Sequence, residues 1–282
     1  MVIKHRFAFS SSDKHITTFL KKHQIEIDAG EIVSAVEIFE NNEGFNEIVK
    51  FLTSHNIHSY PSTSQCIYTK EEIENAEWLK VRSTWINLYP QPQNDFSYIN
   101  ITYDTKDSCD GRVAKETFCH EGLVQKDSFL LRNKPNWGSR NFLMINWVHD
   151  EFFVSDKVEL VFKDNNVKGL EFYKVLYRSR KEMEGIKQIY IQNYLPPGLK
   201  KESIEKEILC SKCDTIRYLR KLGYIFYDKE AFKDLDVDII KSSERFGEIT
   251  RSSMIFVNQR LRKIIMGNKL GKDLLFEPIQ LV

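Results

Sequence analysis

The sequence predicts an α+β protein, with a small N-terminal α/β sandwich followed by a duplicated α+β domain. Three observations predict this class. Strand and helix patterns alternate over the first part of the chain, a helix–turn–strand unit occurs twice in the later part, and two cysteines precede each copy of that unit. A chain of 282 residues is long enough for about two domains with buried cores.

Residues 1–68 are predicted to form the small α/β domain, in the order β-α-β-α-β. Short alternating patterns predict three strands, at residues 4–10, 31–40 and 58–68. Apolar residues at helical spacing predict two helices, at residues 11–23 and 42–56. This domain contains no motif that indicates a particular chemistry.

Residues 69–97 are predicted to connect the two domains as a helix followed by a proline-rich loop. Thr69 and Glu72 have the spacing of a capping box, which predicts that a helix starts there. Apolar residues continue through Trp78 to Val81, so the helix is expected to include them. Residues 87–96 contain two prolines and form the loop.

Residues 98–282 are predicted to be one duplicated domain, with units at about 98–180 and 205–282. In each unit an N-cap residue, an amphipathic helix, a turn and a strand follow one another. The matched positions are Phe153 with Phe256, Ser155 with Asn258, Asn165 with Asn268 and Phe172 with Phe276. A chance match is the alternative, because helix–turn–strand segments are common in α/β proteins.

Four of the five cysteines flank this repeat. Cys109 and Cys119 precede the first unit, and Cys210 and Cys213 precede the second as a CxxC pair. Zinc prefers four tetrahedral ligands, and thiolates are soft and charged. The hypothesis is one structural zinc in a zinc-ribbon-like element, which joins the two halves and contributes to folding; His120 is an alternative ligand. Loss of the metal, with small buried thiols left behind, is the other interpretation, because Cys109 and Cys119 lack the usual spacing.

The remaining chemical groups do not indicate catalysis. A redox role for Cys210 needs a strand–CxxC–helix setting, which the preceding residues do not provide, and Cys66 lies in a predicted strand. His149, Asp150 and Glu151 are adjacent and cannot simply converge on one substrate, so a local role near a helix N-terminus is expected. The chain contains no GxGxxG, P-loop or HExxH motif. The sequence therefore predicts a non-enzymatic protein.

Composition and charge limit the partners. The net charge is +1, with 41% hydrophobic and 29% charged residues, so the whole chain does not favour nucleic acid as a partner. The first residues lack the apolar region of a signal peptide, and no run approaches the roughly 18 apolar residues of a membrane helix. We expect a cytoplasmic protein without a membrane partner. An odd number of cysteines in that compartment argues against a disulfide framework.

From residue 98 onward the chain resembles the double-CxxCG-motif family, a group of poorly characterised bacterial proteins. The resemblance rests on three segments: "CHEGLVQKDSF" with Cys119, Gly122 and Gln125, "NWVHDEFFVS" with Trp147, Asp150, Glu151 and Phe153, and "CSKC" with Cys210 and Cys213. The chain also departs from the family pattern. The first cysteine of the first CxxC would fall at Glu116, with Cys109 as its substitute, and His120 and Asp214 replace glycines.

The resemblance implies a function. Relatives resemble immunity proteins, which bind a bacterial toxin and neutralise it, so the implied partner is a protein toxin. Two alternatives stay open. One is a zinc-containing nucleic-acid-binding regulator, for which salt-sensitive binding would be evidence. The other is an enzyme whose site is assembled across the fold, for which a deep pocket with perturbed acids would be evidence.

Overall fold

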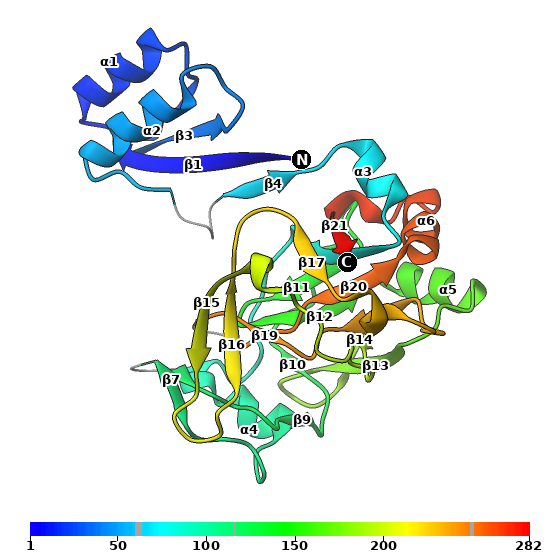
Figure 1. Cartoon of the computed structure of the whole chain (residues 1–282). Coiled ribbons are helices and arrows are strands. Elements are labelled where there is room, and N and C mark those ends of the chain that lie inside the picture. Colours follow the sequence, from blue (N-terminus) through cyan, green and yellow to red (C-terminus); the bar gives the residue numbers. More distant parts are fainter. Residues whose placement is uncertain (60–63, 115–116, 249–250) are drawn as a thin grey trace. The chain divides into compact units, whose positions relative to one another are not determined.

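A computed structural model of the chain describes residues 1–59, 64–114, 117–248 and 251–282, and it confirms the α+β class (Figure 1). The chain divides into two compact units. Unit 1 comprises Met1–Glu72 and Lys221–Tyr224, and unit 2 comprises Ile73–Arg220 and Ile225–Val282. The small domain therefore extends beyond residue 68 and receives a short segment from late in the chain. Residues 73–97 belong to unit 2 and are not a separate connector.

Unit 1 is an antiparallel sheet with two helices on one face (Figure 1). Its elements are β1 (Val2–Ser10), α1 (Lys14–Lys22), β2 (Ile27–Asp28), β3 (Val33–Phe39), α2 (Phe45–Ser54) and β4 (Gln65–Ile67). The strand order β2-β3-β1-β4 with this β-α-β-β-α-β sequence is the ferredoxin-like arrangement. The prediction lacked β2, because two residues are too few to show an alternating pattern. Of the third predicted strand only Gln65–Ile67 is a strand, and residues 60–63 lie outside the described residues.

The core of unit 1 follows from the alternation of apolar residues along its strands and from their helical spacing in its helices. Phe7 and Phe9 alternate along β1 toward the helices, and Val36 and Ile38 do the same from β3. The helices contribute residues at helical spacing, Ile16 and Leu20 from α1 and Ile48 and Leu52 from α2. These side chains form one cluster between the sheet and the helices.

The predicted connector helix is correct at its start and wrong beyond residue 75. The Glu72 amide donates to Thr69 Oγ1 at 3.1 Å, and the Thr69 amide donates to Glu72 Oε2 at 2.7 Å, as in a capping box. The helix, α3 (Lys70–Asn75), then ends. Residues Trp78–Ser83 form strand β5 in the middle of a sheet. Periodicity cannot distinguish a short apolar run in a buried strand from one in a helix, and here long-range pairing decides.

Unit 2 contains two five-stranded sheets with the same internal order. The first has the order β10-β13-β14-β12-β11 and the second β17-β21-β5-β20-β18. In both, the first pair is parallel and the other three pairs are antiparallel. The strands are β10 (Leu130–Leu131), β11 (Phe142–Ile145), β12 (Val148–Val154), β13 (Glu171–Tyr177), β14 (Glu182–Tyr190), β17 (Ile225–Tyr227), β18 (Ile239–Lys241), β20 (Ile255–Asn258) and β21 (Leu274–Leu281).

The middle strands of the two sheets occupy different places in the sequence. In the first sheet β14 directly follows β13, whereas in the second sheet the same place is filled by β5, which precedes all other strands of unit 2. The first half therefore extends to Tyr190, beyond the predicted end near residue 180. The second half includes a strand from far outside the predicted range 205–282. The two halves share one architecture but differ by a permutation of one strand.

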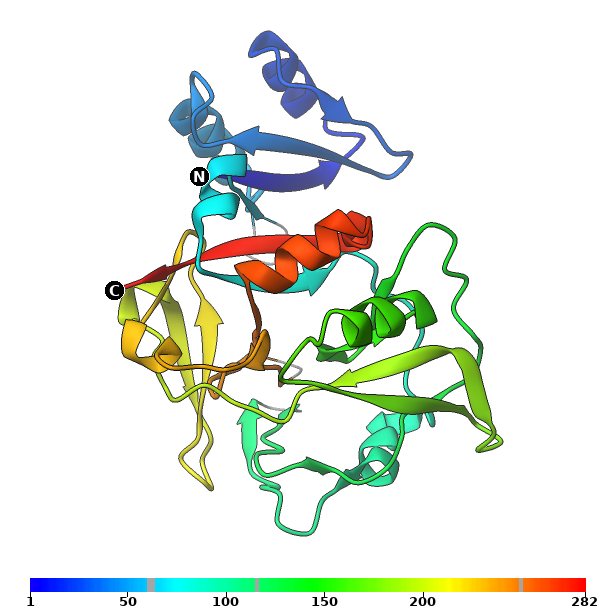
Figure 2. The same cartoon turned by 90° about the vertical axis from the view of Figure 1, so that its right-hand side faces the viewer.

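The helix of each half ends in the same way. Helix α5 (Asp156–Asp164) lies beside β13 and β14, and α6 (Gln259–Gly267) lies beside β21 (Figure 2). The side-chain amides of Asn165 and Asn268 donate to the carbonyl four residues earlier, at 2.8 and 2.9 Å. The N-caps differ, because Asn258 Oδ1 accepts from the Leu261 amide at 2.9 Å and the Ser155 side chain makes no such bond.

One apolar core joins both halves of unit 2. Buried residues of β5 and β20, such as Val81 and Val257, are in the same cluster as Phe152 of β12 and residues of both helices. The smaller elements are η1 (Asn94–Phe96), α4 (Tyr98–Thr102), β6 (Tyr103–Asp104), β7 (Arg112–Ala114), β8 (Thr117–Phe118), β9 (Val124–Gln125), η2 (Lys201–Ser203), β15 (Ile204–Leu209), β16 (Ile216–Arg220), η3 (Lys229–Phe232), β19 (Arg245–Phe246) and η4 (Gly271–Asp273). No helix in the described part of the chain is long and apolar enough to cross a membrane.

Candidate metal centre

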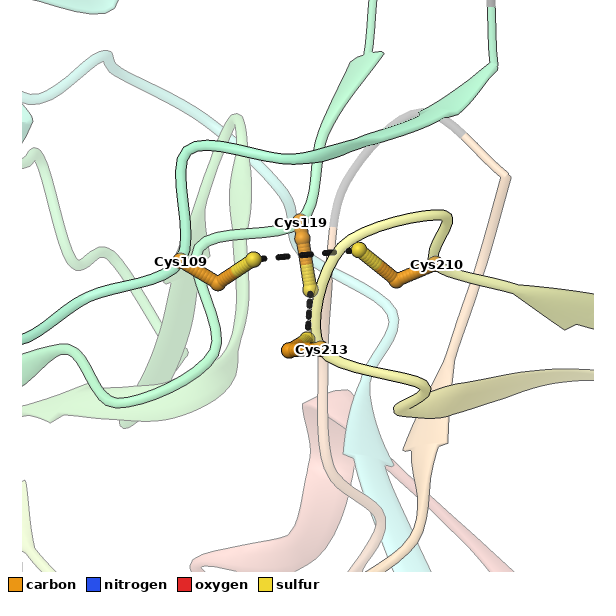
Figure 3. Close-up of side chains that lie close together, drawn as sticks. All are labelled: Cys109, Cys119, Cys210 and Cys213. Carbon is orange, nitrogen blue, oxygen red and sulfur yellow. Dashed lines mark hydrogen bonds between the residues drawn. The ribbon is translucent and has the colours of Figure 1, made fainter.

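Four cysteines from the two halves of unit 2 converge at one point (Figure 3). The Sγ atoms of Cys109, Cys119, Cys210 and Cys213 all lie within 4.8 Å of one another. Two of the separations are 3.7 Å, between Cys109 and Cys210, and 3.6 Å, between Cys119 and Cys213. A disulfide has an S–S distance of about 2.05 Å, whereas a zinc tetrahedron with Zn–S bonds of about 2.3 Å has edges of about 3.8 Å. The cluster is compatible with a structural metal. His120 is not a member of it.

The CxxC pair lies in a tight turn between β15 and β16. The Cys210 amide donates to the Thr215 carbonyl at 3.0 Å, and the Asp214 amide donates to the Cys210 carbonyl at 3.2 Å. Asp214 has a φ of 56°, in the left-handed region. The Thr215 hydroxyl lies 3.3 Å from Cys213 Sγ. These bonds turn the backbone so that both thiols point to the same side.

The other cysteine pair repeats this geometry although its spacing is much longer. The Cys109 amide donates to the Glu121 carbonyl at 2.8 Å, and the His120 amide donates to the Cys109 carbonyl at 3.0 Å. In both turns the amide of the first cysteine donates to the carbonyl two residues after the second cysteine. The amide of the residue directly after the second cysteine donates to the carbonyl of the first cysteine. His120 also has a positive φ, 53°. The first site is therefore a CxxC-type turn into which the β7–β8 hairpin is inserted, with Cys109 in the first cysteine position. Glu116 lies outside the described residues.

The positive φ at His120 and at Asp214 can be compared with the residue type that the sequence pattern has at these positions. These are the two positions at which the double-CxxCG pattern has glycine, which adopts the left-handed region without a steric penalty. Histidine and aspartate are among the non-glycine residues that are enriched there. Both residues are therefore compatible with the left-handed backbone, and the two turns have the same geometry.

Gly111 is in contact with the cysteine cluster. Its amide donates to Cys109 Sγ at 3.3 Å. A β-carbon at this position would lie 2.7 Å from Cys210 Sγ and 2.6 Å from Lys212 Cβ, which is closer than real β-carbons approach other atoms. Only glycine leaves room for the two turns to meet.

Substitution of Gly111 by alanine is therefore expected to separate the two turns and weaken metal binding. We expect the Gly111→Ala variant to lose its metal at least about tenfold faster to a chelator, since disturbed metal sites commonly lose 10–100-fold in affinity. The measurement is the rate of metal transfer to a coloured chelator. The matched control is Gly267→Ala, because no atom other than those of its chain neighbours and its own helix backbone lies within 4 Å of a β-carbon there. Equal release rates in the two variants would contradict the packing argument.

The surroundings affect the four thiols differently. Burial raises the pKa of Cys119 to about 12, whereas the Thr215 hydroxyl is the main cause that lowers the pKa of Cys213 to about 6. The Gly111 amide by itself lowers the pKa of Cys109. Burial and the neighbouring thiols have the opposite effect and are stronger together, so the pKa of Cys109 is raised. Arg217 is 1% exposed and donates to the Cys119 carbonyl at 2.6 Å, which places a cation beside the cluster. A bound divalent ion would add the positive charge needed to keep all four groups as thiolates.

A cavity of about 770 Å³ lies next to the cysteine cluster and is lined by both halves of unit 2. Sequence reasoning missed it. Asp150 and Glu151 line the cavity instead of contacting a helix N-terminus, so the local role expected for them is wrong. Glu151 forms a buried ion pair with Lys241 of β18, and the Asp150 carboxylate accepts the Ser253 amide at 3.0 Å. Their partners lie about a hundred residues away, and the only available signal was their place in the family-like segment.

The fold and the cluster define an α+β protein with a four-cysteine candidate metal centre built from two equivalent turns. No protein-family model matches the chain, and no curated protein matches it.

Proposed function

We propose that the chain is a zinc-stabilised, non-enzymatic binding protein of the cytoplasm that acts as an immunity protein against a bacterial toxin. The closed cysteine site carries the first part of this proposal. Four thiolates at tetrahedral spacing suit zinc and complete its coordination, so that no position remains for water or substrate. The ion would hold the two halves together, and the function would reside in a surface.

An aromatic cluster that includes two residues of the cavity wall is the proposed binding surface. Trp147 lies 4.9 Å from Tyr89 and 4.6 Å from Phe96, measured between ring centroids. Tyr89 and Phe96 are 37% and 42% exposed. Phe96 and Trp147 also have positive φ values of 56° and 70°, which are strained for bulky side chains and are found most often at functional sites. Tryptophan and tyrosine are over-represented among residues that dominate protein–protein binding energy.

The immunity role is supported by the resemblance to the double-CxxCG pattern. Cys119, Gly122 and Gln125 keep the phase of that pattern, and the left-handed backbone at His120 and Asp214 agrees with its glycines. These observations support membership of a family associated with toxin immunity. They make a protein toxin the proposed partner.

The two alternatives differ in their support. The cavity with a buried acid favours the enzyme alternative, since burial raises the pKa of Glu151. However, one oxygen of Glu151 pairs with Lys241 and the other accepts from Gln188 at 3.1 Å, so the carboxyl group is engaged on both sides. The nucleic-acid alternative gains little from the basic residues of β1, because Lys4 and Arg6 both pair with Glu37.

The proposal has a direct genetic test. The product of the neighbouring reading frame is expressed in a bacterial host, with and without this chain, and growth is measured. We expect rescue by the wild-type chain and by Tyr173→Ala, which alters an aromatic residue outside the cavity. We expect little rescue by Trp147→Ala. Failure of the wild-type chain to rescue growth or to bind that product would reject the pairing.

A further inference from the structure

The cavity beside the cysteine cluster has the dimensions of a ligand site. Its volume of about 770 Å³ is in the range of small-molecule pockets, about 300–1,000 Å³. Its wall includes the aromatic residues Phe96, Tyr98, Tyr103 and Trp147, and its polar side includes Asp150. The proposed immunity role uses Phe96 and Trp147 of this wall, but not the phenols of Tyr98 and Tyr103 or the carboxylate of Asp150.

Three polar atoms at the cavity lack partners in the protein. Among the described residues, none makes a hydrogen bond with the hydroxyl of Tyr98 or Tyr103. One carboxylate oxygen of Asp150 accepts the Ser253 amide at 3.0 Å, and the other accepts no hydrogen bond from the described part of the chain. Tyr98 is only 5% exposed. The three groups line the open cavity, and their atoms are not among the buried polar atoms without a partner, so they are accessible to a ligand.

The two phenols and the carboxylate are close enough to act on one ligand. Burial raises the pKa of Tyr98, and the nearby Asp150 carboxylate raises it further. Burial, with Glu151 and Asp150, raises the pKa of Tyr103 well above its usual value. Both phenols therefore stay protonated at neutral pH and can donate. The site offers two O–H donors and one carboxylate acceptor.

The aromatic wall favours a flat ligand. The rings of Tyr98 and Trp147 are nearly parallel, at 19°, with centroids 6.1 Å apart, and Phe96 lies 4.6 Å from Trp147. Stacking on such rings stabilises a bound base by about 1–3 kcal/mol in other proteins. A planar ring that packs against this wall would reach the phenols with one edge.

Several charged groups of the cavity already have partners in the protein. Lys241 pairs with Glu151, Lys212 pairs with Asp110, and Arg251 contacts Glu121 at 3.2 Å. Lys106 also lines the cavity and has no ion pair among the described residues, and Arg245 shares Glu121 with Arg251, so the cavity keeps an excess of positive charge. Asp150 forms no ion pair with the described residues, so a ring that donates an N–H group to it does not break one.

We propose that this cavity binds a planar heterocycle that presents a hydrogen-bond acceptor and an N–H donor on one edge, as a nucleobase does. The hydroxyls of Tyr98 and Tyr103 donate hydrogen bonds to the acceptor of the ligand, and the N–H group of the ligand donates to the Asp150 carboxylate. The ring packs against Trp147 and Phe96.

Isothermal titration calorimetry with adenosine, guanosine, cytidine and uridine tests this proposal on the full chain. We expect at least one nucleoside to bind, with no binding of ribose. The Tyr103→Phe variant removes one donor and is expected to bind that nucleoside about 5–10-fold more weakly, which corresponds to one net hydrogen bond. The Asp150→Asn variant is expected to change the order of preference among the four.

The matched control is Tyr173→Phe, because Tyr173 stacks on Tyr190 outside the cavity. Circular dichroism and thermal unfolding establish that each variant is folded. Two results would overturn the proposal: no nucleoside binding at millimolar concentration, or equal affinities in the Tyr103→Phe and Tyr173→Phe variants. Either result leaves the growth-rescue test unaffected, because rescue by the wild-type chain does not depend on nucleoside binding or on the Tyr103 hydroxyl.

Discussion

Replacing Cys210 and Cys213 together with serine is expected to remove the metal from the purified protein and to destabilise unit 2 strongly. The two halves supply two ligands each, so the double variant leaves only Cys109 and Cys119 for the ion. The binding free energy of a structural zinc is part of the folding free energy. We expect the free energy of unfolding to fall by about 4 kcal/mol or more, a size that single-site changes reach mainly by loss of a metal, a disulfide or a large core contact.

Elemental analysis of protein purified without added zinc, combined with urea unfolding, measures both effects. About one zinc per chain is expected in the wild type, and a strong chelator should reproduce the loss of stability. The matched control is Cys66→Ser, which changes the cysteine of unit 1, where Sγ accepts the Gly223 amide at 3.2 Å and a hydroxyl can do the same. Wild-type protein without metal, or a double variant as stable as the control, would show that the cluster is a set of free thiols.

Neutralising Glu277 is expected to have the second largest effect, and this effect depends on pH. Glu277 of β21 is 8% exposed and pairs with Lys80 at 2.7 Å and Arg220 at 2.8 Å. Burial alone raises its pKa, but Lys80 and Arg220 outweigh burial and lower it to about 2. Removal of the carboxylate leaves two cations in a poorly hydrated site. Breaking such a pair costs about 3–5 kcal/mol.

The sign of the pH dependence follows from the lowered pKa. A carboxyl group with a lower pKa in the folded state stabilises the fold fully above its unfolded pKa, about 4.5, and this contribution is lost as the pH falls toward 2. A shift of this size corresponds to about 3 kcal/mol. Urea unfolding at a series of pH values measures this effect. The free energy of unfolding of the wild type is expected to fall between pH 5 and pH 2, and the fall in Glu277→Gln is expected to be smaller by about this amount.

An exposed glutamate provides the control for this series. Glu184 lies on β14 in the same unit and is exposed, so Glu184→Gln should follow the wild-type curve. If Glu277→Gln also followed the wild-type curve from pH 7 to pH 2, Glu277 would not be a stabilising counter-ion for Lys80 and Arg220.

Local patterns in the sequence predicted the features that depend on neighbouring residues. The capping box at Thr69 and Glu72 was confirmed, and the helices of unit 1 follow the predicted apolar spacing. The asparagine turns at Asn165 and Asn268 were matched in the sequence and form the same bond. Each of these features is determined within about four residues.

Features that depend on distant partners were not predicted. The apolar residues of β5 fitted a helix as well as a strand, and pairing with β20 and β21 decides between them. The long Cys109–Cys119 spacing hid a turn equivalent to CxxC, because an inserted hairpin has no signature of its own. Asp150 and Glu151 were assigned to the nearest helix, since their partners Ser253 and Lys241 could not be identified along the chain.

The permuted position of β5 has a consequence for synthesis on the ribosome. This strand emerges before every other strand of unit 2 and well before both of its sheet neighbours, β20 and β21. While the chain grows, both edges of β5 lack their native partners, and unpaired apolar strands are prone to association. The segment Lys221–Tyr224, which completes unit 1, also emerges late. Completion of each unit therefore waits for a segment made after most of that unit, and a nascent chain stalled before residue 255 should be a substrate for chaperones.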